Sequence, residues 1–340
     1  MSEPLVVVDA DVLGRHRTGD ETYVLNLLRE LGGLAAGSGL RIGAITRHAH
    51  LVPPGIDVFE LETTLQEARM LWTVPRLLRR EGAALVHTQY AVPARAPCPA
   101  VVTVHDLSFE RDPSLLPWKD RLVFRRVVPR AVRAAVRVLT VSERTRADLV
   151  ELYAVPDDKI VVTPNGVDPA FTPDDTVPRG AFVLAVGAVQ RRKNQVAAAA
   201  AAAAVGLPLV VVGPVKDEGL ATELRARGAD LRGYVTKVEL VELYRTAACL
   251  IQPSRYEGFG LPVLEAMACG TPVVTVDEAA LREVAGGAAV IVDGEHLADG
   301  LRRALAERER LVAAGLERAR VFSWRTTAAK TLDVYREAIG

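Results

Sequence analysis

Cysteine is scarce in this 340-residue chain, which has three, at positions 98, 249 and 269. They lie far apart and form no metal-ligand spacing, and so sparse a set excludes a disulfide framework and is typical of a reducing compartment. Net charge is also lacking, because 42 basic residues balance 42 acidic ones. A nucleic-acid-binding protein usually carries a basic surplus, so the balance argues against a nucleic-acid partner.

A leader and a membrane span are also not expected. The N-terminus, MSEPLVVVDAD, has an acidic residue before a short apolar run, which predicts no signal peptide and a cytoplasmic protein. Residues 196–215 contain no charge, but Gly206 and Pro208 divide them. Because alanine contributes little to membrane insertion, this segment predicts a buried helix followed by a strand.

Neither a P-loop nor a glycine-x-glycine-x-x-glycine turn follows the first expected strand of either domain. Their absence argues against a phosphate-hydrolysing ATPase and a nicotinamide-dependent dehydrogenase.

Short Val/Ile/Leu runs alternate with helical segments throughout a chain that is 49% hydrophobic and long enough for two domains. Such alternation predicts an α/β protein with parallel sheets covered on both faces. The expected strands are 5–9, 41–46, 84–88, 100–105, 136–141 and 160–163, then 182–187, 209–213, 231–235, 249–253, 272–276 and 288–292. The proline-rich segment 164–180 separates the two sets as a linker. We therefore expect two doubly wound, Rossmann-like domains facing one another across a cleft, with ligands at the carboxyl ends of the strands.

The most informative segment is PSRYEGFGLPVLEAMACGTPVV, residues 253–274. A strand there is followed by a glycine loop and then by a helix that Pro262 opens and Gly270 closes. The unpaired N–H groups and the dipole of the first helical turn form a site for an anion such as a diphosphate.

Two glutamates eight residues apart, Glu257 and Glu265, flank this anion site. Since carboxylates repel phosphate but accept hydrogen bonds from hydroxyls, Glu265 could hold a ribose diol and Glu257 a sugar. Arg192 and Lys193, at the start of a helix after the strand 182–187, could supply the cations. Together these groups predict a site for a nucleotide-diphospho-sugar. The alternative is two surface glutamates and an arginine–lysine pair on a solvated helix end.

The block EGFGLPVLEAMACGTPVV resembles the signature of the retaining glycosyltransferase family 4, which has the GT-B fold. Supporting segments are TGDETYVLNLL, VTVHDLSF, VSERTRADL, PNGVDPAFTP, GYV and the closing FSWRTTAAKTLDVYREA. HDLSF and FSW resemble bacterial mannosyl- and rhamnosyltransferase members. We expect an acceptor-side domain over 1–172, a donor domain over 173–325, and a final helix over 326–340 that packs back on the first domain.

The resemblance implies roles for single residues. Arg192 and Lys193 bind the donor diphosphate, Glu265 binds the ribose, and Glu257 and His105 contact the transferred sugar as catalytic residues. The remaining donor-binding residues are Gly19 near the phosphates, Val235 near the base, and Gly258, Phe259, Gly260 and Leu261 along the sugar-phosphate. A buried strand-end histidine with a purely structural role remains the alternative for His105.

Two positions depart from the family pattern. Many members carry glycine-x-glycine in the first loop, whereas here Gly19 is followed by Asp20 and Glu21. Because a glutamate beside a diphosphate would repel it, Glu21 either points away or indicates a different loop. Many members also carry arginine where this chain has Ala188, so Arg192 is expected to bind more of the phosphate charge.

The expected activity is transfer of a hexose, with GDP-mannose as the guess for the donor, to a carbohydrate or lipid-linked acceptor hydroxyl with retention. We expect no cofactor and no metal. The alternatives are a catalytically silent sugar-nucleotide-binding protein, or a GT-B phosphorylase or epimerase. Asp9 and Asp11 form an aspartate-x-aspartate motif, but their place at the end of the first strand argues against a metal role.

Residues 118–146 carry nine basic residues against two acidic ones, a surplus of seven in a neutral protein. Leu122, Val123, Phe124, Val127 and Val128 interleave with the arginines, so the stretch is a basic amphipathic segment. One interpretation is a solvated helix face whose valines join the core. The other is a peripheral contact with anionic lipid at the inner membrane face, or with a lipid-linked diphosphate acceptor.

Overall fold

The computed structural model describes residues 3–15, 18–63, 65–112, 118–174, 176–178 and 180–340. The chain divides into two compact units, the first made of residues 1–166 and 323–340 and the second of residues 167–322. The first division falls inside the segment expected as a linker, of which residues 175 and 179 lie outside the described part. The second falls one residue before the closing helix α14 (Trp324–Ile339).

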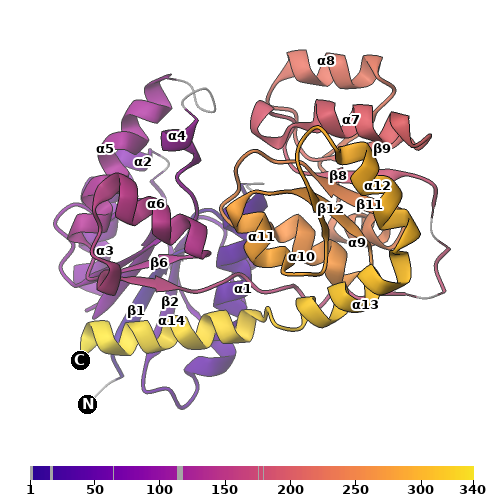
Figure 1. Ribbon diagram of the computed structural model, residues 1–340. Helices are drawn as coiled ribbons and strands as arrows, with labels where there is room; N and C mark the ends of the chain where they lie inside the picture. The colour runs from indigo at the N-terminus through magenta and orange to yellow at the C-terminus, as the bar shows by residue number, and fades with distance from the viewer. Residues whose placement is uncertain (1–2, 16–17, 64, 113–117, 175, 179) are drawn as a thin grey trace. The chain divides into compact units, whose positions relative to one another are not determined.

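The first unit contains a seven-stranded parallel sheet in the order β3-β2-β1-β4-β5-β6-β7 (Figure 1). Its strands are β1 (Leu5–Asp9), β2 (Arg41–Thr46), β3 (Asp57–Glu60), β4 (Leu85–Gln89), β5 (Ala100–Val104), β6 (Arg137–Thr140) and β7 (Ile160–Val162). Six of these follow the expected runs within a few residues. The sequence analysis missed β3, because this four-residue edge strand is mostly exposed and presents no continuous apolar run.

Helices cover both faces of this sheet. They are α1 (Thr18–Ala35), α2 (Gln66–Ala68), α3 (Val74–Arg80), α4 (Ser108–Arg111), α5 (Trp118–Ala134), α6 (Glu143–Tyr153) and α14, with short turns η1 (Ala49–Leu51), η2 (Arg69–Thr73) and η4 (Asp157–Lys159). Alternate residues of β5 assign the faces: Ala100 packs in the cluster of α3, and Val102 and Val104 pack in the cluster of α5. α3 and α5 therefore cover the same face. α14 packs against α1 and β4, within the first unit.

The second unit repeats this architecture with six parallel strands in the order β10-β9-β8-β11-β12-β13. The strands are β8 (Val183–Val186), β9 (Leu209–Val212), β10 (Asp230–Gly233), β11 (Cys249–Gln252), β12 (Val273–Val276) and β13 (Val290–Val292). The helices are α7 (Gln195–Ala204), α8 (Glu218–Ala226), α9 (Lys237–Thr246), α10 (Leu261–Ala268), α11 (Ala279–Ala285), α12 (Leu297–Ala306) and α13 (Arg308–Ala319), with the turn η5 (Arg191–Lys193).

The uncharged segment 196–215 is a helix followed by a strand, as the sequence predicts. Its alanine helix is α7 and its strand is β9, and both contribute to the core of the second unit. Among the described residues, no helix is both long and apolar enough to cross a membrane.

Each sheet has one point where the strand order reverses direction. In the first unit this switch point lies between β1 and β4, and in the second it lies between β8 and β11. Open parallel sheets of this kind bind ligands beyond the carboxyl ends of the strands at the switch point. The loops that follow β8 and β11 are therefore where a donor site is expected in the second unit.

Candidate active site

The loop after β8 brings two cations to the switch point of the second unit. Gly187 has φ of 141°, in a region that L side chains rarely adopt. A Cβ placed there would lie 3.0 Å from Cε of Lys193, so the glycine leaves room for the lysine side chain to pass. η5 then carries Arg192 and Lys193, and the Arg192 carbonyl accepts a hydrogen bond from the Arg255 N–H at 2.9 Å, which ties this loop to the one after β11.

Glu257 lies in the loop after β11 and meets both cations. Its carboxylate accepts hydrogen bonds from Arg192 Nη1 at 2.9 Å, from Lys193 Nζ at 2.5 Å and from Gln252 Nε2 at 2.9 Å. Burial by itself would raise the pKa of Glu257, but the two adjacent cations hold that pKa well below its usual range. Glu257 is therefore ionised, and the cluster of Glu257, Arg192 and Lys193 has a net charge of +1.

These side chains are not on a solvated surface. Glu257 is 6% exposed and Glu265 9% exposed, and the side chains of Arg192 and Lys193 are 15% and 11% exposed. The alternative interpretation of surface glutamates and a solvated arginine–lysine pair is therefore wrong. A buried cluster with a surplus positive charge suits an anionic ligand.

The glycine loop leads into α10 as the sequence predicts. Gly260 caps the helix with φ of 114°, Pro262 lies in its first turn, and Gly270 follows its end in the left-handed region. Gly258 is half-buried and Leu261 begins the helix. Phe259 is 4% exposed and its ring packs edge-on against Phe322, so its side chain belongs to the packing of the second unit.

Glu265 lies in the second turn of α10 in a different environment. It accepts a hydrogen bond from the Tyr244 hydroxyl at 2.8 Å. Burial raises the pKa of Glu265 to about 7, and the nearby Asp168 charge adds to the rise. Asp168 is paired with Lys237 at 2.5 Å. The two glutamates of the motif thus differ in charge state near neutral pH, although their spacing gives no hint of it.

Two further positions that the sequence analysis discussed in relation to the donor lie in loops. Val235 is half-buried between β10 and α9, two residues after Gly233 with its positive φ. Ala188 lies in the loop after β8, where its carbonyl accepts a hydrogen bond from Gln195 Nε2 at 3.0 Å.

His105 follows β5 in the first unit and is buried between two tyrosine rings. Its ring centroid lies 4.7 Å from that of Tyr23 and 5.6 Å from that of Tyr90. Burial lowers the pKa of His105, although the nearby Asp20 and Asp106 oppose the shift, so the imidazole is neutral at pH 7. Its Nε2 atom is buried without a hydrogen-bond partner among the described residues, and the nearest carboxylate oxygen, on Asp20, is 4.0 Å away.

A buried hydrogen-bond chain leads from α14 to the ring beside His105. His87 Nδ1 is 2.6 Å from the Tyr335 hydroxyl, and His87 Nε2 is 2.7 Å from Thr103 Oγ1. Thr103 Oγ1 is in turn 3.1 Å from the Tyr23 hydroxyl. Since burial lowers the pKa of His87 to about 3, this chain contains a neutral histidine. It explains how α14 is held within the first unit.

Asp9 and Asp11 form an ion cluster with arginines. Asp9 pairs with Arg69 Nη1 at 2.7 Å, and Asp11 pairs with Arg47 Nε at 2.7 Å and also with Arg15. Within the described part of the chain, no set of three or more His, Cys, Asp or Glu side chains could hold a metal ion.

Gly19 and Glu21 lie in the first turn of α1. Gly19 is exposed, with nothing within 4 Å of where a Cβ would lie. Glu21 accepts a hydrogen bond from the Gly14 N–H at 2.7 Å. Its carboxylate therefore holds the loop after β1.

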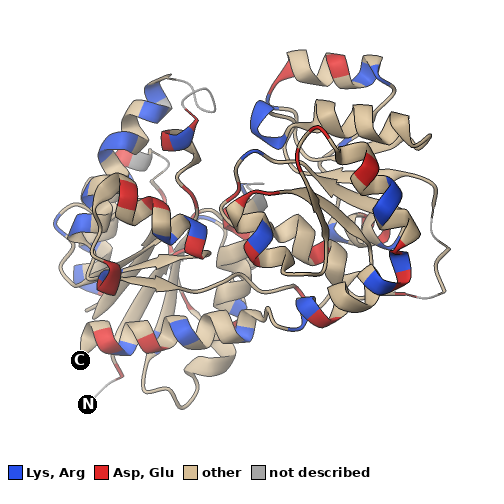
Figure 2. Ribbon diagram, in the orientation of Figure 1, with Lys and Arg blue, Asp and Glu red and all other residues tan. Residues whose placement is uncertain are grey.

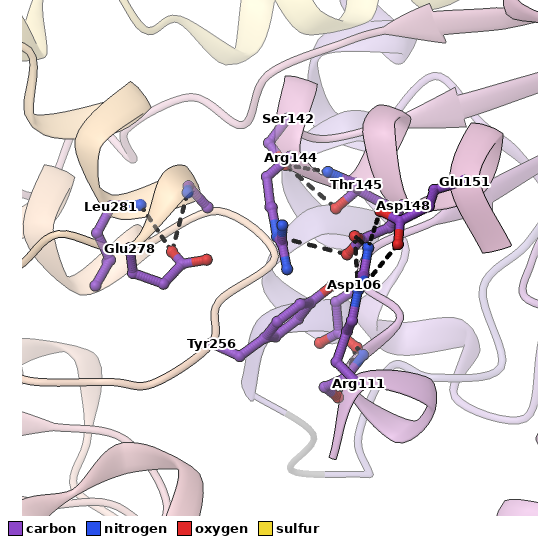
Figure 3. Close-up of polar contacts among 12 residues, drawn as sticks. Asp106, Arg111, Ser142, Arg144, Thr145, Asp148, Glu151, Tyr256, Glu278 and Leu281 are labelled. Carbon is purple, nitrogen blue, oxygen red and sulfur yellow. Dashed lines mark hydrogen bonds and ion pairs between the residues drawn. The ribbon is translucent and has the colours of Figure 1, made fainter. Parts of the chain in front are cut away.

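Polar side chains at the start of α6 form hydrogen bonds and ion pairs close to His105 in the fold (Figure 3). Ser142 caps the helix by accepting the Thr145 N–H, and the Thr145 hydroxyl donates to the carbonyl of His105 at 3.1 Å. The fully buried Asp148 pairs with Arg111 at 2.5 Å and with Arg144 at 3.5 Å. These contacts fix the backbone around His105.

Sequence reasoning missed three side chains around the motif glutamates, namely Gln252, Tyr244 and Asp168. Gln252 could have been found, because a glutamine at the carboxyl end of a buried strand needs a polar partner. Tyr244 and Asp168 lie 21 and 97 residues before Glu265 in the chain, so only the fold brings them to it.

The raised pKa of Glu265 predicts a pH-dependent stability. Because its folded pKa, about 7, exceeds the unfolded value near 4.5, its stabilising contribution is complete below about pH 4.5 and is lost as the pH rises through 7. Glu265→Gln removes the charge, so its stability relative to wild type should improve by up to about 3 kcal/mol between pH 4.5 and pH 8. Urea unfolding at both pH values measures this, with the exposed Glu309→Gln as control. An equal pH dependence in wild type and Glu265→Gln would contradict the assigned pKa.

Comparisons with known proteins identify the family. The profile described as "Glycosyltransferase Family 4" matches residues 18–171, and "Glycosyl transferases group 1" matches residues 174–319. The chain is 30% identical to the O-antigen chain mannosyltransferase B of Escherichia coli over 70% of each chain. It is 34% identical to the D-inositol 3-phosphate glycosyltransferase of Acidothermus cellulolyticus over 71% of this chain and 62% of that protein.

Solved structures agree on the fold. A sucrose-phosphate synthase from Thermosynechococcus elongatus matches with a TM-score of 0.78 at 22% identity, covering 98% of each chain. Anabaena HepE in complex with UDP-glucose matches with a TM-score of 0.74 at 14% identity, covering 98% of this chain and 99% of that one. The two family matches and the identity to known glycosyltransferases show that the chain is a glycosyltransferase of family 4, and the solved structures show that it has the GT-B fold.

Proposed function

We propose that the enzyme transfers a hexose from a nucleotide-diphospho-sugar to an acceptor hydroxyl with retention of configuration. The observation that carries the proposal is the buried cluster of Glu257, Arg192 and Lys193 at the β8/β11 switch point. A diphosphate needs cations and N–H groups, and a sugar needs a charged acceptor for its hydroxyls. This cluster supplies both within one pair of loops.

In the proposed reaction, the bond between the anomeric carbon and the diphosphate oxygen breaks, and the departing oxygen keeps the electron pair. Arg192, Lys193 and the Leu261 N–H at the start of α10 stabilise the developing charge. Pro262 has no N–H, and the N–H groups of Val263 and Leu264 donate to the Gly260 carbonyl. The acceptor hydroxyl then bonds to the anomeric carbon on the face that the diphosphate leaves, and its proton passes to a departing phosphate oxygen. This scheme needs no separate base.

The present contacts of the cations suggest how binding begins. Arg192 and Lys193 are held by Glu257 before any donor arrives, so their side chains are already ordered near the place of the diphosphate. Preorganised charges of this kind need little rearrangement during the reaction, which makes electrostatic stabilisation effective. In this proposal Glu257 turns toward sugar hydroxyls as the diphosphate takes over part of the cations' charge.

Glu265 is proposed to hold the ribose diol and Val235 to lie near the base. A carboxyl with a pKa of about 7 accepts two hydroxyls well only when it is ionised, so donor binding should weaken below neutral pH. On the first unit, His105 is our candidate for contact with the sugar hydroxyls, because its neutral ring has a buried Nε2 atom with no described partner. Gly19 is the corresponding candidate near the phosphates.

GDP-mannose is the donor that we propose to test first. The support is the 30% identity to a mannosyltransferase over 70% of each chain. We also propose that no divalent metal is needed, because cationic side chains and N–H groups can take the leaving-group charge, and because Asp9 and Asp11 are paired with arginines.

Kinetics of two alanine variants test the site. Glu257→Ala should lower turnover by roughly 10²–10³-fold, because its contacts with the sugar strengthen in the transition state. Glu265→Ala should mainly raise the Michaelis constant for the donor, because a ribose contact is similar in both states. The donor is chosen by thermal shift with GDP-, UDP-, ADP- and dTDP-sugars, and the product's anomeric configuration is read by NMR.

Wild-type kinetics in both variants would contradict the site assignment. The same assay in EDTA should give an unchanged rate. Loss of turnover that manganese restores would instead assign a metal role to the acidic residues of the first unit.

We further propose that α5 makes a peripheral contact with anionic membranes. Basic residues recur along this helix (Figure 2). Val128 is buried in the core, as the solvated-helix interpretation expects, yet Trp118, Leu122 and Val123 are 65%, 41% and 55% exposed. Apolar side chains left in water beside Lys119 and Arg126 suit a surface that rests on lipid headgroups.

Vesicle sedimentation tests this contact. The protein should pellet with anionic vesicles at low salt, and pelleting should fall when salt screens the attraction beyond about a Debye length. Neutral vesicles are the control. Equal pelleting with neutral and anionic vesicles, or none at low salt, would contradict the proposal and favour an acceptor in solution.

A further inference from the structure

A second feature of the first unit, outside α5 and the donor loops, combines apolar and cationic side chains. It is a hollow of about 450 Å³, hereafter the arginine hollow, on the outer side of η2 and α3. Its lining is Leu71, Trp72, Pro75, Arg76, Arg79, Ala94 and Arg95. No acidic residue lines it.

The π-helical turn η2 exposes the apolar part of the hollow. Leu71 is 48% exposed and Trp72 58% exposed, although large apolar side chains of this protein are mostly buried. The widened turn places both side chains outward while Val74 and Leu77 of the following helix face the core. Both side chains therefore leave a large part of their apolar surface open to solvent.

The cationic part of the hollow is not neutralised. Arg76, Arg79 and Arg95 are all exposed, and none of them has a carboxylate partner in the described part of the chain. By contrast, Arg80 on the same helix is paired with Glu81 at 2.7 Å. The hollow thus combines three guanidinium groups with the apolar side chains of Leu71 and Trp72. This combination suits a ligand that has anionic groups next to hydrocarbon chains.

The turn that carries Trp72 is held rigidly. Arg69 begins the turn and is 4% exposed, with its guanidinium paired to Asp9 at the end of β1. The Ala94 N–H donates to the Met70 carbonyl at 3.0 Å and fixes the loop that carries Arg95. The backbone that carries Trp72 is therefore already ordered, which lowers the entropy cost of placing this side chain in a membrane interface.

We propose that the arginine hollow binds the headgroups of an anionic phospholipid membrane, with Trp72 and Leu71 entering the interface. The hollow lies on α3, which covers the same sheet face as α5, so both surfaces can meet one membrane. Arg76, Arg79 and Arg95 take the lipid phosphates by charge-assisted hydrogen bonds. The proposal goes beyond the α5 contact and does not depend on the donor or the reaction.

Tryptophan fluorescence tests the insertion directly. The chain has three tryptophans, and Trp324 is 3% exposed, so Trp118→Phe leaves Trp72 as the only exposed one. With vesicles of anionic lipid brominated in the acyl chains, this variant should lose a large part of its emission. The control Trp72→Phe/Trp118→Phe, which keeps only the buried Trp324, should lose almost none. If the Trp118→Phe variant pellets but its emission stays unquenched, the hollow does not meet the membrane and the proposal is overturned.

Charge reversal supplies an independent test. Arg76→Glu/Arg79→Glu should lower partitioning to anionic vesicles at low salt by at least about tenfold. The matched control is Arg225→Glu/Arg320→Glu, which makes the same charge change at two exposed arginines of the second unit and should partition nearly as wild type. Equal loss in both double variants would mean a general charge effect, and no loss in the first would mean an empty hollow; either result overturns the proposal. Thermal unfolding of each variant checks that it is folded.

Discussion

The architecture around the switch point of the second unit depends on one interaction, the pairing of the ionised Glu257 with Arg192 and Lys193. A buried carboxylate is costly unless it is paired and hydrogen-bonded, and removing one partner of such a cluster leaves an uncompensated charge. The fold meets this constraint by bringing the loops after β8 and β11 together at the switch point. Gly187 leaves space for the lysine, and the hydrogen bond from Arg255 to Arg192 joins the loops.

The same constraint separates the two glutamates of the motif. Glu257 lies beside cations and is ionised, whereas Glu265 is buried beside a tyrosine hydroxyl and has a pKa of about 7. Glu257 therefore carries a permanent negative charge, whereas Glu265 gains or loses its charge near neutral pH. This difference fits the division of labour that we propose, with one glutamate at the transferred sugar and the other at the ribose.

Much of this arrangement could be predicted from the sequence. In the described part of the chain, short apolar runs located twelve of the thirteen strands, because most of these strands are buried on both faces and leave a strong apolar signal. The exposed edge strand β3 left none, and β10, which is also a partly exposed edge strand, was found from the short segment 231–235. Proline and glycine located the two ends of α10, the helix at whose start we propose that the diphosphate binds. The sequence could not reveal the partners of Glu265, because Tyr244 and Asp168 reach it only through tertiary packing. The sequence also did not show that Asp9 and Asp11 pair with arginines, because Arg69 in η2 and Arg47 after β2 reach them only in the folded unit.

For the basic residues, too, the sequence shows where they are concentrated along the chain, but only the fold shows which apolar side chains lie exposed beside them. The surplus over 118–146 was visible in the sequence, but which apolar side chains remain exposed on α5 depends on how the helix packs. The arginine hollow was not visible at all, since Arg95 comes from a loop distant from Arg76 in the chain. Its turn is anchored to β1 through Arg69, so this surface and the carboxyl edge of the first sheet belong to one rigid part of the unit.

The most direct test of the central claim is a double-mutant cycle on nucleoside diphosphate affinity. Isothermal titration would compare wild type, Glu257→Gln, Lys193→Met and the double variant with the nucleoside diphosphate of the preferred donor. If the carboxylate and the cation act as one unit, the two substitutions should be non-additive, with a coupling free energy above about 0.5 kcal/mol. Additive effects within that limit would contradict the claim that Glu257 holds the cations for the diphosphate.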